Sequence, residues 1–166
     1  SGHLHVQHCK RSEDNRGIWE MVTASLATPS CKYAILTYRD DRSFLYRTQS
    51  LDVEAWAKKN QCTEEDLLNF KQFQTPFLRR VFYNQAIASL NEVPELTDSE
   101  REQMAQLYSL LKFHYYQGTA YQVQEPVRND PAYELWQEDG MATQQGEYFR
   151  YILEDGKRDY NRLEVN

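Results

Sequence analysis

Residues 97–118 read TDSEREQMAQLYSLLKFHYYQG, and this stretch predicts the longest helix of the chain. Thr97 to Glu100 has the Thr-x-x-Glu form of a capping box, in which each side chain binds the backbone of the other residue. Apolar side chains then recur at helical spacing, which places them on one face. They are Met104, Leu107, Leu110 and Leu111, with His114 at the end of the row. Because Gly118 is typical of the position just after a helix end, we expect a helix from Asp98 to about Gln117.

The flanking sequence predicts further helices. Helical apolar spacing favours helices over 17–27, 50–60, 63–73, 75–93 and 131–138, and Thr143 onwards favours another. Ser50 is the expected cap of the second of these, and Thr63 begins a second sequence close to a capping box. Thr75-Pro76 resembles a helix start, with Pro at the first helical position.

Strands are expected mainly near residues 31–48. The segments CKYAILTY and SFLYRT are rich in aromatic and aliphatic residues, and a short charged turn separates them. This pattern predicts an antiparallel hairpin. Residues 119–125 alternate and are compatible with a strand, whereas residues 143–165 fit either a helix or a second short hairpin, with the helix favoured. The predicted fold class is therefore α+β, mainly α, with five or six helices packed with one early antiparallel β-hairpin at about 31–48.

The expected organisation is a flexible N-terminal arm over residues 1–16 and a single globular domain over residues 17–166. The arm is polar and charged, and its first residues, Ser1-Gly2, are typical of the remnant of a cleaved tag. No repeat or linker composition divides the remainder.

The charge distribution limits the classes of partner. The chain has 166 residues and a net charge of -6. Residues 48–166 contain twelve Lys/Arg and twenty Asp/Glu, which is unfavourable for the phosphate backbone of nucleic acids. Only Arg39, Arg42 and Arg47 suggest a local basic patch, and a solvated hairpin is the preferred interpretation. We expect no nucleic-acid partner and no membrane insertion, because no apolar run is long enough to span a bilayer.

Two sets of residues are candidates for chemistry, one for metal binding and one for nucleophilic catalysis. His3, His5, His8 and Cys9 are potential metal ligands, but we expect no metal or cofactor because they lie in the predicted flexible arm. Cys62 or Cys31 with His114 would suit a nucleophilic pair, and Cys62 precedes a predicted helix N-terminus, which lowers a thiol pKa. The common nucleotide-binding, hydrolase and metalloprotease motifs do not occur in the sequence.

Tyrosine is the unusual component, with 12 residues in the chain. Aromatic side chains concentrate at Tyr108, Tyr115, Tyr116, Tyr121, Tyr133 and Trp136. Tyr and Trp are enriched at protein interfaces, although such residues also fill the boundary of a core. We therefore predict a non-catalytic domain that binds another protein through an acidic, Tyr/Trp-rich surface. The alternatives are a small Cys/His hydrolase or transferase and an aromatic-lined domain that binds a small ligand or carbohydrate.

Overall fold

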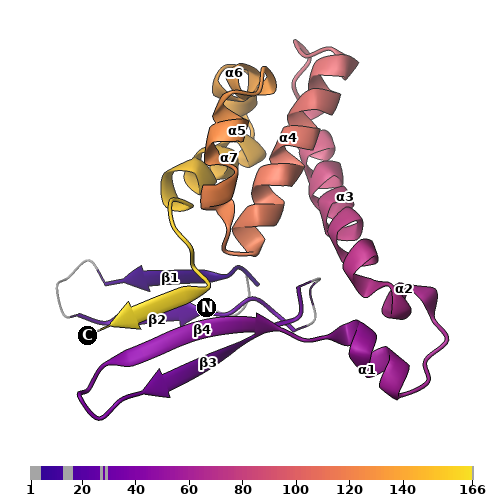
Figure 1. Cartoon of the computed structure of the whole chain (residues 1–166). Helices are drawn as coiled ribbons and strands as arrows, with labels where there is room; N and C mark the ends of the chain where they lie inside the picture. Colours follow the sequence, from indigo (N-terminus) through magenta and orange to yellow (C-terminus); the bar gives the residue numbers. More distant parts are fainter. Residues whose placement is uncertain (1–4, 13–16, 27, 29, 166) are drawn as a thin grey trace. The chain divides into compact units, whose positions relative to one another are not determined.

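The structure is a computed structural model that describes residues 5–12, 17–26, 28 and 30–165. Within these residues the fold is α+β and mainly α, with seven α-helices and two small antiparallel sheets (Figure 1). The predicted fold class is confirmed. The chain forms two compact units, and each is described by itself. The first contains residues 1–76, 116–118 and 159–166, and the second contains residues 77–115 and 119–158.

The first unit contains both sheets. Strands β1 (His8–Arg11) and β2 (Trp19–Val22) form a two-stranded sheet. Strands β3 (Lys32–Tyr38), β4 (Phe44–Ser50) and β5 (Arg162–Val165) form a three-stranded sheet with β4 in the middle. The β3–β4 pair confirms the predicted hairpin. Cys9, Tyr46 and Tyr160 form the buried cluster of this unit, against which Met21, Phe44 and Leu163 pack.

A buried polar network holds distant segments of the first unit together. The Gln7 side chain donates to the Tyr46 hydroxyl at 3.0 Å and to the Tyr160 carbonyl at 2.8 Å. The Asn161 side-chain oxygen Oδ1 accepts from the Lys32 ammonium at 2.6 Å and from the Thr48 hydroxyl at 2.7 Å. These bonds satisfy groups that would otherwise be costly to remove from water.

The predicted arm and the predicted helix at 17–27 require correction. Residues 8–11 form β1, and the Gln7 side chain is fully buried, so this part of the arm belongs to the first unit. Residues 19–22 form β2. Their backbone pairs with β1, and this pairing outweighs the helical spacing of the apolar residues in the segment. Residues 1–4 and 13–16 of the arm lie outside the described residues. The single domain stays a prediction, since both units share helices α3 and α4.

Three helices follow strand β4. Helix α1 (Val53–Lys59) is capped by Asp52, whose carboxylate accepts from the Ala55 amide, and not by Ser50 as predicted. Helix α2 (Glu65–Leu68) is a single turn whose cap position is Glu64, so the predicted capping box of Thr63 does not form. Helix α3 (Phe70–Leu90) runs through Pro76, although Thr75-Pro76 was expected to begin a helix. Proline fits the helical φ, but within a helix it lacks the amide donor and its ring crowds the carbonyl four residues earlier.

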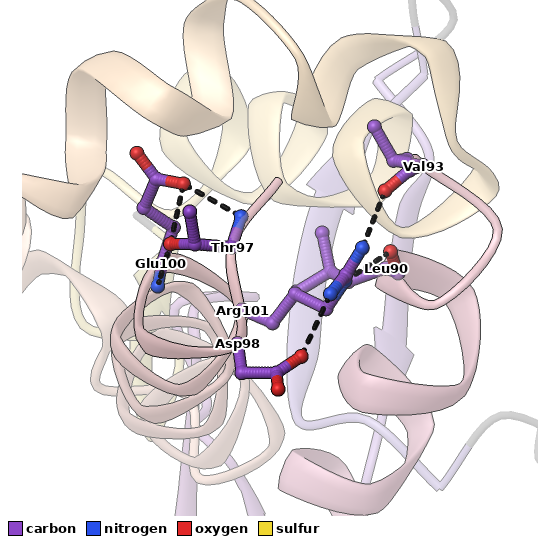
Figure 2. A network of polar contacts seen from close by, with 6 residues as sticks. All are labelled: Leu90, Val93, Thr97, Asp98, Glu100 and Arg101. Carbon is purple, nitrogen blue, oxygen red and sulfur yellow. Dashed lines mark hydrogen bonds and ion pairs between the residues drawn. The ribbon is translucent and has the colours of Figure 1, made fainter. Parts of the chain in front are cut away.

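Helix α4 (Asp98–Tyr116) confirms the prediction made from residues 97–118. Glu100 accepts from the Thr97 amide at 2.7 Å, and the Thr97 hydroxyl accepts from the Glu100 amide at 3.3 Å, so the capping box is complete (Figure 2). Arg101 donates to the carbonyls of Leu90 and Val93, which ties the end of α3 to the start of α4 (Figure 2). Gly118 follows α4 with φ +71°, as expected for a residue that ends a helix.

Shorter helices complete the second unit. They are the 3₁₀ turn η2 (Ala120–Gln122), α5 (Gln124–Arg128), α6 (Ala132–Gln137), the 3₁₀ turn η3 (Gly140–Ala142) and α7 (Gln144–Asp155). The possible strand at 119–125 is therefore wrong. At the C-terminal end the favoured helix is confirmed by α7, which Thr143 caps through the Gly146 amide at 3.0 Å.

Candidate functional site

The predicted aromatic surface is largely part of the core of the second unit. Tyr108 and Trp136 are 0% exposed, and Tyr115 is 4% exposed. Tyr133 is half-buried and Tyr121 is 38% exposed, while Tyr116, which belongs to the first unit, is half-buried. A partner cannot contact side chains that are removed from the surface, so these six residues do not form one exposed patch.

Aromatic stacking explains this burial. The ring of Trp136 stacks on Phe149 with 5.1 Å between centroids, and Tyr108 lies 5.5 Å from Trp136. The Trp136 indole donates to the Met104 carbonyl at 2.9 Å. Tyr115 donates to Asp155 at 3.2 Å, and burial, with the nearby Asp155 charge, raises the pKa of its hydroxyl. Large amphipathic rings thus fill part of the core of this unit, beside aliphatic side chains such as Leu111 and Ile152.

Lys112 is a polar feature of this core that the sequence analysis missed. Its ammonium lies 4.9–5.1 Å from the ring centroids of Phe82, Tyr108 and Tyr148. It donates to the Gln85 side-chain oxygen at 2.8 Å and to the Tyr108 hydroxyl at 2.9 Å. Burial lowers the pKa of Lys112 to about 8. The signal in the sequence is its position four residues after Tyr108, on the buried side of α4.

We expect Lys112→Met to change how stability depends on pH. In the unfolded chain Lys112 titrates near 10.4, so between about pH 8 and 10 the unfolded chain binds more protons than the folded chain. The unfolding free energy of the wild type should therefore rise with pH relative to Lys112→Met, by up to roughly 3 kcal/mol. Cation–π attraction favours the ammonium and opposes this rise. Urea unfolding at several pH values measures it, and the exposed Lys157→Met is the control. Parallel curves for the wild type and Lys112→Met would contradict the expectation.

The predicted catalytic residues fall in different units. Cys31 and Cys62 belong to the first unit, are half-buried and carry free thiols. His114 belongs to the second, where its Nδ1 lies 3.0 Å from the Thr119 hydroxyl. Burial and the Arg79 charge lower the pKa of His114, while the contact with Thr119 opposes them. The Cys/His pair stays a prediction.

Two of the four predicted metal ligands, His8 and Cys9, have other contacts, and no hydrogen bond or ring contact is observed for the His5 side chain among the described residues. The Cys9 thiol is buried and donates to the Tyr160 carbonyl at 3.6 Å, and the His8 ring lies 4.5 Å from the Tyr160 ring. His3 lies outside the described residues. Across the part of the chain that the structure describes, no three His, Cys, Asp or Glu residues are grouped to hold a metal ion.

The edge of the three-stranded sheet presents a surface that the sequence analysis did not single out. Leu36 and Tyr38 of β3 are 58% and 69% exposed. They pair across the sheet with Tyr46 and Phe44, so they lie on the same face as the buried cluster of the first unit. The apolar face of this sheet therefore extends beyond its buried part onto the edge strand.

The backbone groups of alternate residues of β3 also point outward, away from the sheet. The Arg39 amide donates to the Ser43 carbonyl, and the Leu51 amide donates to the Cys31 carbonyl. Since inward and outward groups alternate along an antiparallel strand, the odd-numbered residues of β3 bond to β4. Ala34, Leu36 and Tyr38 consequently direct their amide and carbonyl groups away from β4, at the edge of the sheet.

None of the helices in the described ranges combines the length and the apolar character that crossing a membrane requires.

Comparison with known proteins identifies the helical part of the chain. The profile of a family described as the C-terminal domain of cyclic nucleotide phosphodiesterase matches residues 52–159, from the cap of α1 to beyond the end of α7. A search of curated proteins found no match. The match covers more than half of the chain, which therefore belongs to the family of C-terminal domains of cyclic nucleotide phosphodiesterases.

Proposed function

We propose that this chain is a non-catalytic protein-binding domain, and that it binds an extended segment of another protein along β3. The observation that carries the proposal is the exposed edge of the three-stranded sheet, with Leu36 and Tyr38 on its apolar face. An extended segment added to a sheet edge gains main-chain hydrogen bonds, and its alternate side chains supply specificity.

The sequence of β3 supports this choice of surface. Proteins protect sheet edges with proline, charged side chains, bulges or short strands. The strand is seven residues long, and Lys32 is its only charged residue. The Lys32 ammonium is bound to the Gln117 carbonyl and to Asn161, so its charge is directed to the interior of the unit. A partner segment with apolar residues at alternate positions fits such an edge. The proposal thus retains a protein partner but moves the contact from residues 108–136 to β3.

Leu36→Lys should weaken binding of extended peptides at least about tenfold, because it places a charge on the apolar face of the edge. Peptides selected from a displayed library on the wild-type chain provide the probe, and calorimetry measures their affinity. Hydrogen exchange on the complex should show slower exchange at the amides of Ala34, Leu36 and Tyr38, whose groups point outward.

Thr37→Lys is the matched control for this experiment. Thr37 is exposed on the same strand, but its side chain lies on the opposite face and its backbone is directed to β4. We expect it to leave the affinity unchanged. If Thr37→Lys weakens binding as much as Leu36→Lys, or if the selected peptides instead lose affinity for Val81→Ser on the exposed side of α3, the proposed surface is wrong. Failure to select any peptide also contradicts it.

The family description favours a second candidate function, a part in the hydrolysis of a cyclic nucleotide. Its test is incubation of the purified chain with cyclic nucleotides, with and without added divalent metal ions, and chromatographic detection of the opened product. Turnover that increases with protein concentration would support this candidate and contradict a purely non-catalytic role.

A further inference from the structure

The face of the three-stranded sheet that lies opposite the buried cluster carries an excess of positive charge. Arg47 in the middle strand β4 pairs across the sheet with Arg162 of β5, and both side chains are exposed. Side chains of directly paired residues lie on the same face with Cβ atoms about 5 Å apart, so the two guanidinium groups start from neighbouring positions. Like charges directly opposite each other destabilise a sheet, so this pair is unfavourable in the free chain.

The acidic residues of the sheet do not neutralise this pair. Among the described residues of the three strands, Glu164 is the only acid on this face. Its carboxylate lies 2.9 Å from a guanidinium nitrogen of Arg39 and 3.4 Å from one of Arg162, so two arginines share it. The side chain of Arg47 forms no hydrogen bond or ion pair within the part of the chain that the structure describes. The face therefore lacks negative charge beside Arg47.

The surroundings of the pair favour a protein segment as the source of that charge. Ile35 of β3 lies directly opposite Arg47 on its other side, Leu45 lies two residues before Arg47 on the same face, and both are half-buried. Apolar area beside cations fits a segment that combines acidic and apolar side chains. A nucleic acid is less favourable, because residues 48–166 contain twelve Lys/Arg and twenty Asp/Glu.

We propose that the face around Arg47 and Arg162 binds an acidic segment of a partner protein. A guanidinium forms paired, charge-assisted hydrogen bonds with a carboxylate, so each arginine can hold one acidic side chain. The bound carboxylates also relieve the repulsion between the two arginines. Leu36 and Tyr38 lie on the opposite face, so the proposal goes beyond binding at the edge of β3 and does not depend on it.

The test uses a short synthetic peptide rich in glutamate and glycine with a single leucine, which lacks the alternating apolar residues that suit the edge of β3. A second peptide has glutamine in place of every glutamate. NMR titration of the whole chain at low ionic strength measures both affinities and follows the arginine Nε–H signals. We expect the glutamate peptide to bind about tenfold more tightly, from two ion pairs near the surface, and to shift the signals of Arg47 and Arg162. Added salt should remove most of the difference.

Substitutions of the two arginines make the result specific. Arg47→Gln and Arg162→Gln should each weaken binding of the glutamate peptide by about threefold to fivefold. Arg47→Glu should reverse the preference, so that a peptide with lysine in place of glutamate binds more tightly. Arg42→Gln is the matched control, because it removes the same charge from an exposed position in the turn between β3 and β4. It should leave the affinity unchanged within about twofold.

Stability gives a readout that is independent of the peptide. Arg47→Gln should raise the midpoint of thermal unfolding of the free chain by about 1–3 °C, because it removes the pair of like charges. A lower midpoint together with an unchanged peptide affinity would assign Arg47 to the fold alone and overturn the inference.

Further results would also overturn it. They are an absence of binding by the glutamate peptide, equal binding of the glutamine peptide, and a loss with Arg42→Gln as large as that with Arg47→Gln. Tighter binding of a single-stranded DNA oligonucleotide at the same arginines would replace the acidic segment by a nucleic acid. Leu36→Lys, which blocks the edge of β3, should still bind the glutamate peptide. Loss of binding in that variant would place the peptide at the edge, so failure of this inference and failure of edge binding can be told apart.

Discussion

Trp136→Ala is expected to lower the free energy of unfolding by about 4–5 kcal/mol. The Trp136 side chain is fully buried, stacks on Phe149 and donates to the Met104 carbonyl. Truncation removes these contacts, leaves a cavity and deprives the buried carbonyl of its donor. Urea unfolding followed by circular dichroism measures the loss.

Trp56→Ala is the matched control, because Trp56 on α1 is 56% exposed. We expect it to change the unfolding free energy by no more than about 0.5 kcal/mol. Trp136→Phe should fall between the two, since it retains a ring against Phe149 but loses the indole donor. Equal losses for Trp136→Ala and Trp56→Ala would show that Trp136 is not at the centre of the core.

Gly146→Ala should destabilise the protein by roughly 2–3 kcal/mol, although helix propensity alone predicts a gain of up to about 1 kcal/mol. Gly146 lies in the first turn of α7 against the preceding 3₁₀ turn. A Cβ at this position would lie 2.0 Å from the Gly140 carbonyl oxygen and 2.6 Å from its carbon. Both are backbone atoms, so η3 and α7 would have to separate. Thermal unfolding of the variant gives the sign directly.

Gln144→Ala, two residues earlier in the first turn of α7 and exposed, is the control for this substitution. It changes helix propensity without a close contact and should leave stability within about 0.5 kcal/mol. A stabilised Gly146→Ala would show that η3 can move away from α7 at little cost.

The elements that the sequence predicted correctly depend on short-range signals. Thr97 and Glu100 are three residues apart, so the capping box at α4 is encoded within a single turn. The β3–β4 hairpin is likewise determined by two runs rich in aromatic and aliphatic residues and by the turn between them. By contrast, the apolar residues of β2 recur at helical spacing, so its pairing with β1, with His8 opposite Val22, is evident only in the paired structure.

The candidate sites were harder to predict because burial depends on tertiary contacts. The spacing of Tyr108 and Tyr115 places them on a helix face, but only the packing of α7 and of Trp136 shows that this face is covered. Lys112 reads as a surface residue, since lysine is almost never fully buried unless it is paired. Arg79 lacks any motif, and its contacts with Ser109 and Gln106 are evident only when α3 and α4 are packed together.

The polar network around Asn161 also has a consequence for synthesis of the protein on the ribosome. Its partners Lys32 and Thr48 emerge early, whereas Asn161 and strand β5 emerge only after every helix of the second unit. During translation the β3–β4 hairpin must therefore wait, with Lys32 lacking its Asn161 partner, while helices α3 to α7 have the opportunity to fold first. A nascent chain arrested before Tyr160 should thus contain a protected helical region and a protease-sensitive N-terminal hairpin.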